Sequence, residues 1–158
     1  MNEPLTLEQE ACNADTSEHI RQVAVRLHRM ARKLLDRADR HDQSKLASPE
    51  VELFTEYTPK LAAVTFGSPE YEAMRKSMGP ALGHHYANNR HHPEHHKNGV
   101  EDMTLLDVLE MLCDWDASSK RHHDGNIRRS IEKNADRFGI VPQLRRILEN
   151  SVDEISDG

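Results

Sequence analysis

A histidine and an aspartate stand side by side at positions 41 and 42, directly after a stretch with helical periodicity. An imidazole nitrogen and a carboxylate oxygen are both common ligands of divalent transition metals, and adjacent residues can offer them to one cation. The same dipeptide also occurs at ordinary helix ends, where a histidine complements the helix dipole. The pair His41-Asp42 therefore indicates a metal site only if further ligands accompany it.

Histidine is concentrated in one short internal segment, HHYANNRHHPEHH, which spans residues 84–96 and holds six of the 11 histidines. A polar surface loop that gains charge at low pH is the alternative interpretation. Imidazole is the commonest metal ligand in proteins, so we expect this segment to supply ligands. The spacing leaves open which members of each histidine pair bind, with His91 and His95 among the choices.

Two further candidates lie far from this segment. Asp114 stands in the otherwise apolar stretch EMLCDW, with Glu110 one helical turn before it. A carboxylate in such a stretch is costly to bury unless it is paired or bound to a metal, although an acidic solvent-facing surface is the alternative. His19 borders the apolar stripe of an early helix and is expected to face inward. On a straight helix it would lie far from His41, so we expect the polar residues 36–40 to bend the chain.

Apolar residues recur every three or four positions along most of the chain, which predicts amphipathic helices. Capping residues and Pro or Gly breakers divide this pattern into separate helices. We expect helices at about residues 17–39, 50–65, 81–89 and 127–138, with a kink at Pro59 in the second. Three more are expected to begin at residues 69, 105 and 142. No segment shows the alternation of a strand. We predict an all-α, compact single-domain bundle of five to seven helices over residues 16–150. Residues 1–15 are expected to be loosely ordered, 90–103 to form a loop and 151–158 to be a tail.

Composition excludes several classes of protein. The formal net charge is −6 with histidine neutral, which argues against a nucleic-acid coat protein. No apolar run approaches the ~20 residues that span a bilayer, and the first residues lack the pattern of a secretory signal. Two cysteines cannot build a disulfide framework, and Cys113 lies in an apolar stretch, where we expect it to be buried and reduced. We expect a cytoplasmic protein. A homodimer is compatible with the sequence.

The order His19, His41-Asp42, Asp114 resembles the HD-domain superfamily of metal-dependent phosphohydrolases, whose two-metal members add histidines in the interval. The segments HDQSKL, PALGHHYANNRHHPEHH and DMTLLDVLEMLCDW look like a family of uncharacterised phage and bacterial proteins, over most of residues 17–150. Tyr86 stands where the HD-GYP branch has Glu, and the Gly-Tyr-Pro motif is missing. The resemblance therefore implies an HD-like helical fold and metal site, but not hydrolysis of cyclic di-GMP.

On this basis the first hypothesis is a phosphohydrolase that acts on a nucleotide or another small phosphoester through metal-activated water. Imidazole and carboxylate ligands suit one or two ions of Mn, Fe, Zn, Co or Ni better than Mg. The first metal would be held by His19, His41, Asp42 and Asp114, and a second by Asp42 with two or more of His84, His85 and His92. Lys45, with Arg90 as a helper, would neutralise the substrate phosphate. Glu110 would orient a ligand or activate water.

Two alternatives belong to other functional classes. Some HD-fold proteins carry a di-iron site of four histidines and two aspartates that activates O₂, with a lysine three residues after the Asp of the pair. Asp42 and Lys45 have that spacing. The other alternative is a metal-stabilised module that binds a nucleotide or a protein without catalysis.

Overall fold

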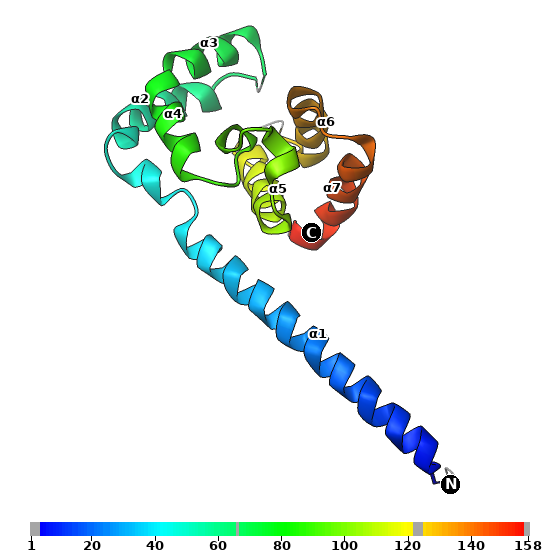
Figure 1. Ribbon diagram of the computed structural model, residues 1–158. Helices are drawn as coiled ribbons and strands as arrows, with labels where there is room; N and C mark the ends of the chain where they lie inside the picture. The colour runs from blue at the N-terminus through cyan, green and yellow to red at the C-terminus, as the bar shows by residue number, and fades with distance from the viewer. Residues whose placement is uncertain (1–3, 66, 122–124, 157–158) are drawn as a thin grey trace. The chain divides into compact units, whose positions relative to one another are not determined.

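The computed structural model describes residues 4–65, 67–121 and 125–156, which fold into seven α-helices and three short 3-10 helices without a strand (Figure 1). The predicted all-α class is therefore confirmed. The α-helices are α1 (Leu7–Arg40), α2 (Glu50–Ala62), α3 (Pro69–Ser77), α4 (Gly79–Asn88), α5 (Leu105–Ser119), α6 (Ile127–Phe138) and α7 (Pro142–Ile155). The 3-10 helices are η1 (Gln43–Leu46), η2 (Pro93–His95) and η3 (Gly99–Asp102). Two of them lie in the predicted loop 90–103.

The chain divides into two compact units, Met1–Asp39 and Arg40–Gly158. The first is formed by α1, which starts earlier than the periodicity predicted because Thr6 and Gln9 form a reciprocal cap. The Gln9 backbone N–H donates to Thr6 Oγ1 at 3.2 Å, and the Thr6 N–H donates to Gln9 Oε1 at 2.8 Å. The segment 1–15, expected to be loosely ordered, is thus helical from Leu7 onward.

Helix α1 runs without interruption through residues 36–39, so the bend expected there is absent. At 1.5 Å per residue, this leaves His19 about 30 Å from Asp39 along the helix axis. No residue of α1 is buried. A 34-residue amphipathic helix without a buried residue leaves an apolar stripe that packs on nothing within its own unit.

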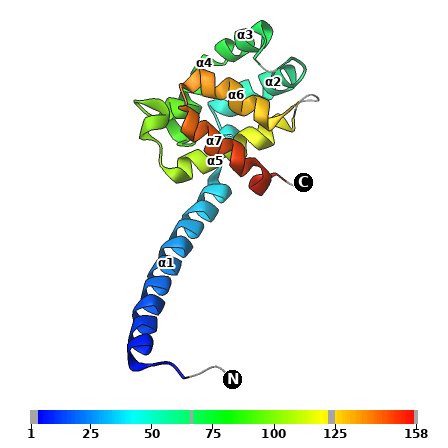
Figure 2. The same cartoon turned by 90° about the vertical axis from the view of Figure 1, so that its right-hand side faces the viewer.

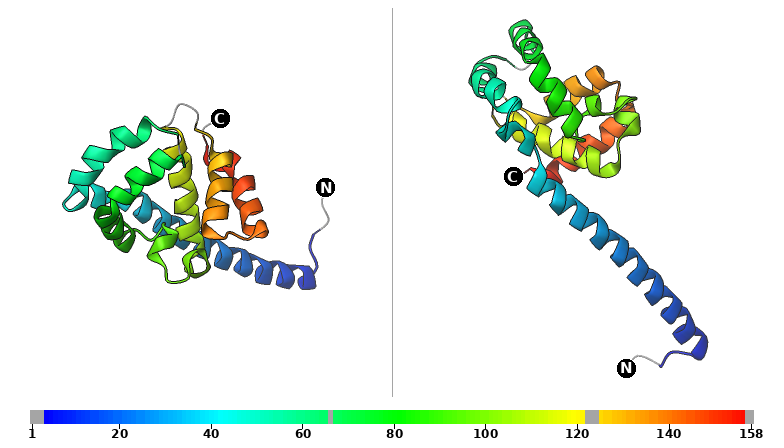
Figure 3. Two further views of the ribbon diagram at one scale, coloured as in Figure 1. Left: turned by 90° about the horizontal axis from the view of Figure 1, so that it is seen from above. Right: turned by 60° about the vertical axis from the view of Figure 1, so that its left-hand side comes forward.

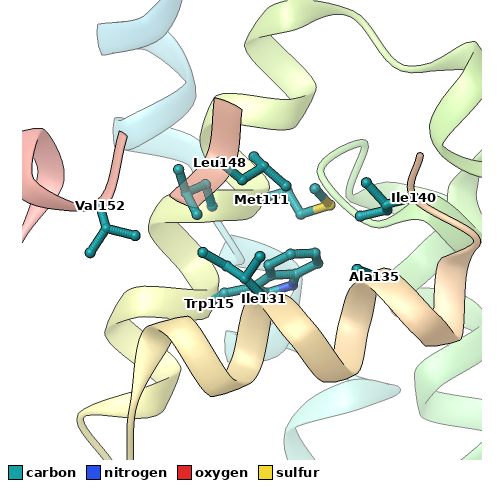
Figure 4. Close-up of a cluster of buried hydrophobic side chains, with 8 residues drawn as sticks. Met111, Trp115, Ile131, Ala135, Ile140, Leu148 and Val152 are labelled. Carbon is teal, nitrogen blue, oxygen red and sulfur yellow. The ribbon is translucent and has the colours of Figure 1, made fainter. Parts of the chain in front are cut away.

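The second unit holds the hydrophobic core, where α5, α6 and α7 meet. Its buried members are Met111, Leu112, Trp115, Ile131, Ala135, Ile140, Leu148 and Val152 (Figure 4). Phe138 packs against this cluster and its ring lies parallel to that of Trp115, with centroids 6.4 Å apart. Figure 2 shows α6 and α7 side by side, and Figure 3 shows α5 between them and the pair α2 and α4. Helix α5 therefore contributes to the core on one side and is available to a site on the other.

Local capping signals explain where the helices of this unit begin and end. Thr104 and Asp107 form a capping box at the start of α5, and Ser68 caps α3. Asn126 caps α6, which ends at Gly139 with a positive φ of 62°. Helix α7 continues to Ile155, into the segment expected to be a tail. Residues 122–124, which precede α6 in the sequence, lie outside the described residues.

The expectation for Cys113 was wrong: both Cys12 and Cys113 are exposed free thiols. Helix α5 buries Met111, Leu112 and Trp115, and position 113 falls between these on the outer face. An apolar sequence neighbourhood did not identify the buried face, since consecutive helical residues point about 100° apart.

Candidate metal centre

The His-Asp pair lies in the turn between α1 and η1. Asp42 has a left-handed backbone conformation, with φ 55° and ψ 15°, which is uncommon for a residue other than glycine. Lys45 of η1 donates from Nζ to Asp42 Oδ2 at 2.5 Å. This leaves the other carboxylate oxygen, Oδ1, facing the histidines of α4 and of the segment after it.

Two sets of ligand atoms are close enough together to hold a cation. The first set comprises Asp42, His85, His91 and His92, and the second comprises His41, Asp42, His91 and Asp114. Within each set the ligand atoms lie within 4.8 Å of one another. Asp42 and His91 belong to both sets, so the two candidate positions are adjacent and share a carboxylate.

Distances within the first set are close to those between ligands of one transition metal, one of them slightly shorter. His85 Nε2 lies 3.3 Å from Asp42 Oδ1 and 2.8 Å from His92 Nε2. Neighbouring ligands at about 2.1 Å from a metal are themselves roughly 3.0–3.4 Å apart. In the second set His41 Nε2 lies 3.5 Å from Asp42 Oδ2 and 3.7 Å from Asp114 Oδ1, a slightly wider spacing.

Two buried polar atoms in this cluster have no hydrogen-bond partner among the described residues: Asp42 Oδ1 and His91 Nε2. They lie 3.6 Å apart. Leaving a buried acceptor unsatisfied costs about 1–3 kcal/mol, and more for a charged group. A cation bound between them would satisfy both atoms, so the residues present fit a metal.

Two carboxylates stand behind the histidines and orient their rings. Glu110 Oε1 lies 3.0 Å from His41 Nδ1 and 3.2 Å from His91 Nδ1. Glu50, which is 0% exposed, accepts from His85 Nδ1 at 2.9 Å. A proton on Nδ1 leaves the lone pair of Nε2 directed into the cluster. This carboxylate–imidazole arrangement is the usual second layer of metal sites.

Protonation equilibria agree with an anionic cluster that holds neutral imidazoles at one end. Burial, aided by the neighbouring histidines, lowers the pKa of His92 to about 2. At the other end, the Asp114 and Glu110 carboxylates raise the pKa of His41 to about 10. Burial alone would raise the pKa of Asp114, but the hydrogen bond with His41 lowers it overall. A metal bound here would take the place of the proton on His41.

The structure brings five of the seven predicted ligands together: His41, Asp42, His85, His92 and Asp114. His19 is exposed on α1 and belongs to neither set. His84 also belongs to neither set, and its Nδ1 contacts Glu50 Oε1 at 2.6 Å. On α4, His85 shares the buried face with Ala81 one turn earlier, whereas His84 points about 100° away.

The three residues expected to act on substrate lie in different surroundings. Lys45 lies beside the cluster, paired with Asp42, and its Nζ is 5.0 Å from the centroid of the Phe54 ring. Glu110 contacts His41 and His91 through Oε1. Arg90 instead pairs with Asp107 of the α5 cap, where Nη2 and Oδ2 are 3.3 Å apart.

Sequence reasoning left out Glu50 and did not commit to His91. The pairing of His91 with His92 was the available signal, and only the fold shows that both rings face the cluster. Glu50 follows Ser48-Pro49 and reads as an ordinary acidic residue at a helix start. Its contact with His85 spans 35 residues, so no local pattern could have identified it.

A cavity of about 230 Å³ opens beside the cluster, with His92 and Asp114 in its lining. Its walls carry aromatic rings from Phe54, Tyr71, Tyr86, Trp115 and Phe138. Four cations also line it: Arg75, Arg129, Lys133 and Arg137. Arg137 pairs with Glu94 at 2.7 Å, and Arg75 pairs with Glu72 at 2.9 Å. The cavity therefore joins the candidate metal ligands to a wall that carries these four cations and one carboxylate, Glu94.

The chain belongs to a family described as "Family of unknown function (DUF5662)", which matches residues 8–154. No curated protein and no solved structure matches it. Among the described residues, no helix has both the length and the apolar character needed to cross a membrane.

Proposed function

We propose that this protein is a phosphohydrolase with an HD-type centre for two divalent transition metals. The observation that carries the proposal is the pair of buried, unsatisfied atoms Asp42 Oδ1 and His91 Nε2, which belong to both ligand sets. The resemblance of the His41-Asp42 and Asp114 motifs to the HD superfamily supports it. So does the two-carboxylate layer that presents Nε2 of the histidines to the cluster.

The surrounding residues indicate the class of substrate. When bound, the metals supply Lewis acidity and lower the pKa of water at the site. The cationic wall of the cavity binds the anionic part of a substrate, and Lys45 stabilises negative charge that develops beside Asp42. The aromatic rings of the same cavity offer an apolar surface to the rest of the molecule. A small phosphoester, with a nucleotide as the first to test, fits this combination.

The two ligand sets make distinct predictions about metal stoichiometry. His92 belongs only to the first set and Asp114 only to the second, whereas Asp42 belongs to both. We expect His92→Ala and Asp114→Asn each to retain one of two metals, and Asp42→Asn to retain neither. His96→Ala is the matched control, since His96 lies in the same segment but belongs to neither ligand set; its ring contacts the Arg90 backbone oxygen at 2.9 Å and packs against the ring of His95.

Activity is tested by phosphate release from a panel of nucleotides and small phosphoesters, with each metal added in turn. Wild type and His96→Ala are expected to release phosphate, and Asp42→Asn is not. Equal release by wild type and Asp42→Asn would contradict the proposal.

One observation favours a second candidate, an O₂-activating di-iron centre. The two ligand sets together contain four histidines and two aspartates, with Lys45 bonded to the shared Asp42. This is the composition expected of HD-type oxygenases. Iron as the bound metal, and turnover that stops when O₂ is removed, would favour the oxygenase. Turnover that continues without O₂ would exclude it.

A further inference from the structure

Helix α1 carries a concentration of exposed apolar side chains. Among the described residues, seven of the twelve large hydrophobic side chains that are exposed lie on this helix: Leu7, Ile20, Val23, Val25, Leu27, Met30 and Leu35. A helix in water gains most of its stability from packing an amphipathic face against a partner. Helix α1 has such a face and buries none of it.

The apolar side chains follow the spacing of a coiled coil. Ile20, Val23, Leu27, Met30 and Leu34 are separated by three, four, three and four residues. These are successive a and d positions of a heptad repeat, whose seam faces another helix. Ala24, Ala31 and Ala38 flank the seam at every seventh position, so a partner helix can approach closely on that side.

Charge is separated along α1. Residues 7–18 contain four acidic residues and no Lys or Arg, whereas residues 19–40 contain seven Lys or Arg and two Asp. The two parts therefore carry formal charges of −4 and +5, with histidine neutral. Two parallel copies of α1 would place like charges together. Two antiparallel copies would place the acidic part of each against the basic part of the other.

We propose that α1 pairs with α1 of a second copy of this chain in an antiparallel coiled coil. The seam aligns best when Ile20 faces Met30 and Val23 faces Leu27 of the second copy. The same alignment sets residues 10–18 against residues 32–40, which matches opposite charges. The interface is self-complementary, as a two-fold symmetric dimer requires. This inference does not rest on the proposed function.

Two leucines of α1 provide a matched pair for the test. Leu27 lies in the seam and is 64% exposed, whereas Leu35 lies outside it and is 66% exposed. By sedimentation, wild type and Leu35→Glu are expected at about twice the 18.1 kDa of one chain, and Leu27→Glu at the mass of one chain. The near-ultraviolet circular dichroism of Trp115, which lies in the core of the second unit, is expected to be unchanged in Leu27→Glu, which separates loss of pairing from loss of the fold.

Cross-linking tests the direction of the pair, in a background where Cys12 and Cys113 are replaced by serine. The double variant Ile20→Cys, Met30→Cys is expected to form a disulfide-linked dimer. Neither single variant is, because the two copies of residue 20 would be about 15 Å apart along the pair, beyond disulfide reach. Cross-linking of the single variants would show a parallel pair and overturn the proposal.

Two other results would also overturn the proposal, because each places a different surface against the seam. Packing of α1 onto residues 40–158 of its own chain predicts a monomeric wild type in which Leu27→Glu, but not Leu35→Glu, lowers the melting temperature. Docking on a lipid surface predicts a monomer that binds vesicles containing phosphatidylserine and loses that binding in Leu27→Glu.

Discussion

Helix α1 leaves apolar side chains such as Leu27 exposed, whereas the unit Arg40–Gly158 keeps ionisable side chains such as Glu50 and His91 buried, at 0% and 1% exposure. Both arrangements oppose the ordinary rule that apolar groups are inside and charged groups are outside. An exposed apolar seam is stabilised when another apolar surface covers it, and a buried anionic cluster is stabilised when it binds a cation. The two proposals together give each region a binding partner: a second apolar helix for α1 and a cation for the buried cluster.

Replacement of Asp42 is expected to have the largest effect on metal binding and on activity. Asp42→Asn keeps the shape of the side chain but removes the charge shared by both ligand sets. We expect loss of bound metal and of phosphate release to background, measured by elemental analysis and a phosphate assay. Asp39→Asn, an exposed residue of α1 outside both sets, is the control and should retain both properties.

Removal of the metal tests whether the buried cluster depends on its cation for stability. A ligand at a hundred to a thousand times its Kd stabilises the native state by about 3–4 kcal/mol, so chelation should lower the melting temperature by on the order of 10 °C. Thermal unfolding with and without chelator measures this. An unchanged melting temperature, with metal shown to have been removed, would mean that the cluster is stable without a cation.

Replacement of Glu110, which lies behind two of the histidines, is expected to lower metal affinity, with a smaller effect than removal of the metal. Glu110→Gln removes the charge that orients His41 and His91, and outer-layer substitutions of this kind typically cost 10–100-fold in metal affinity. Metal titration followed by calorimetry is the measurement. Glu101→Gln, an exposed residue of η3, should bind like wild type. Equal affinities in the two variants would count against an orienting role for Glu110.

The smallest effect is expected from replacing one of the cations that line the cavity. Arg137→Gln removes one positive charge from the cavity and should raise KM about tenfold with little change in kcat, the loss of one charged hydrogen bond. Arg128→Gln on the same helix is the control, since Arg128, like Arg137, pairs with a carboxylate but does not line this cavity. A fall in kcat without a change in KM would remove Arg137 from substrate binding.

The fold was largely predictable because its helix boundaries are local. The Thr104–Asp107 box, the Pro69 start and the Gly139 end each depend on residues close in sequence. The first helix was predicted too short because the Thr6–Gln9 cap was overlooked, although its residues have the required spacing. These errors concern boundaries and leave the class of fold unchanged.

The site was predictable in its residue types and less so in its geometry. His41, Asp42 and Asp114 follow from residue type and context, but the choice between His84 and His85 depends on which face α4 buries. The partnership of Glu50 with His85 arises from contact between α2 and α4 and leaves no mark in either segment alone. A resemblance based on order along the chain brought in His19, yet order carries no information about distance in space.

The most direct test of the central claim is elemental analysis of the untagged full-length chain purified without chelator. The account predicts two transition-metal ions per chain. It would be contradicted by a protein that contains no metal and gains no thermal stability when Mn, Fe, Zn, Co or Ni is added.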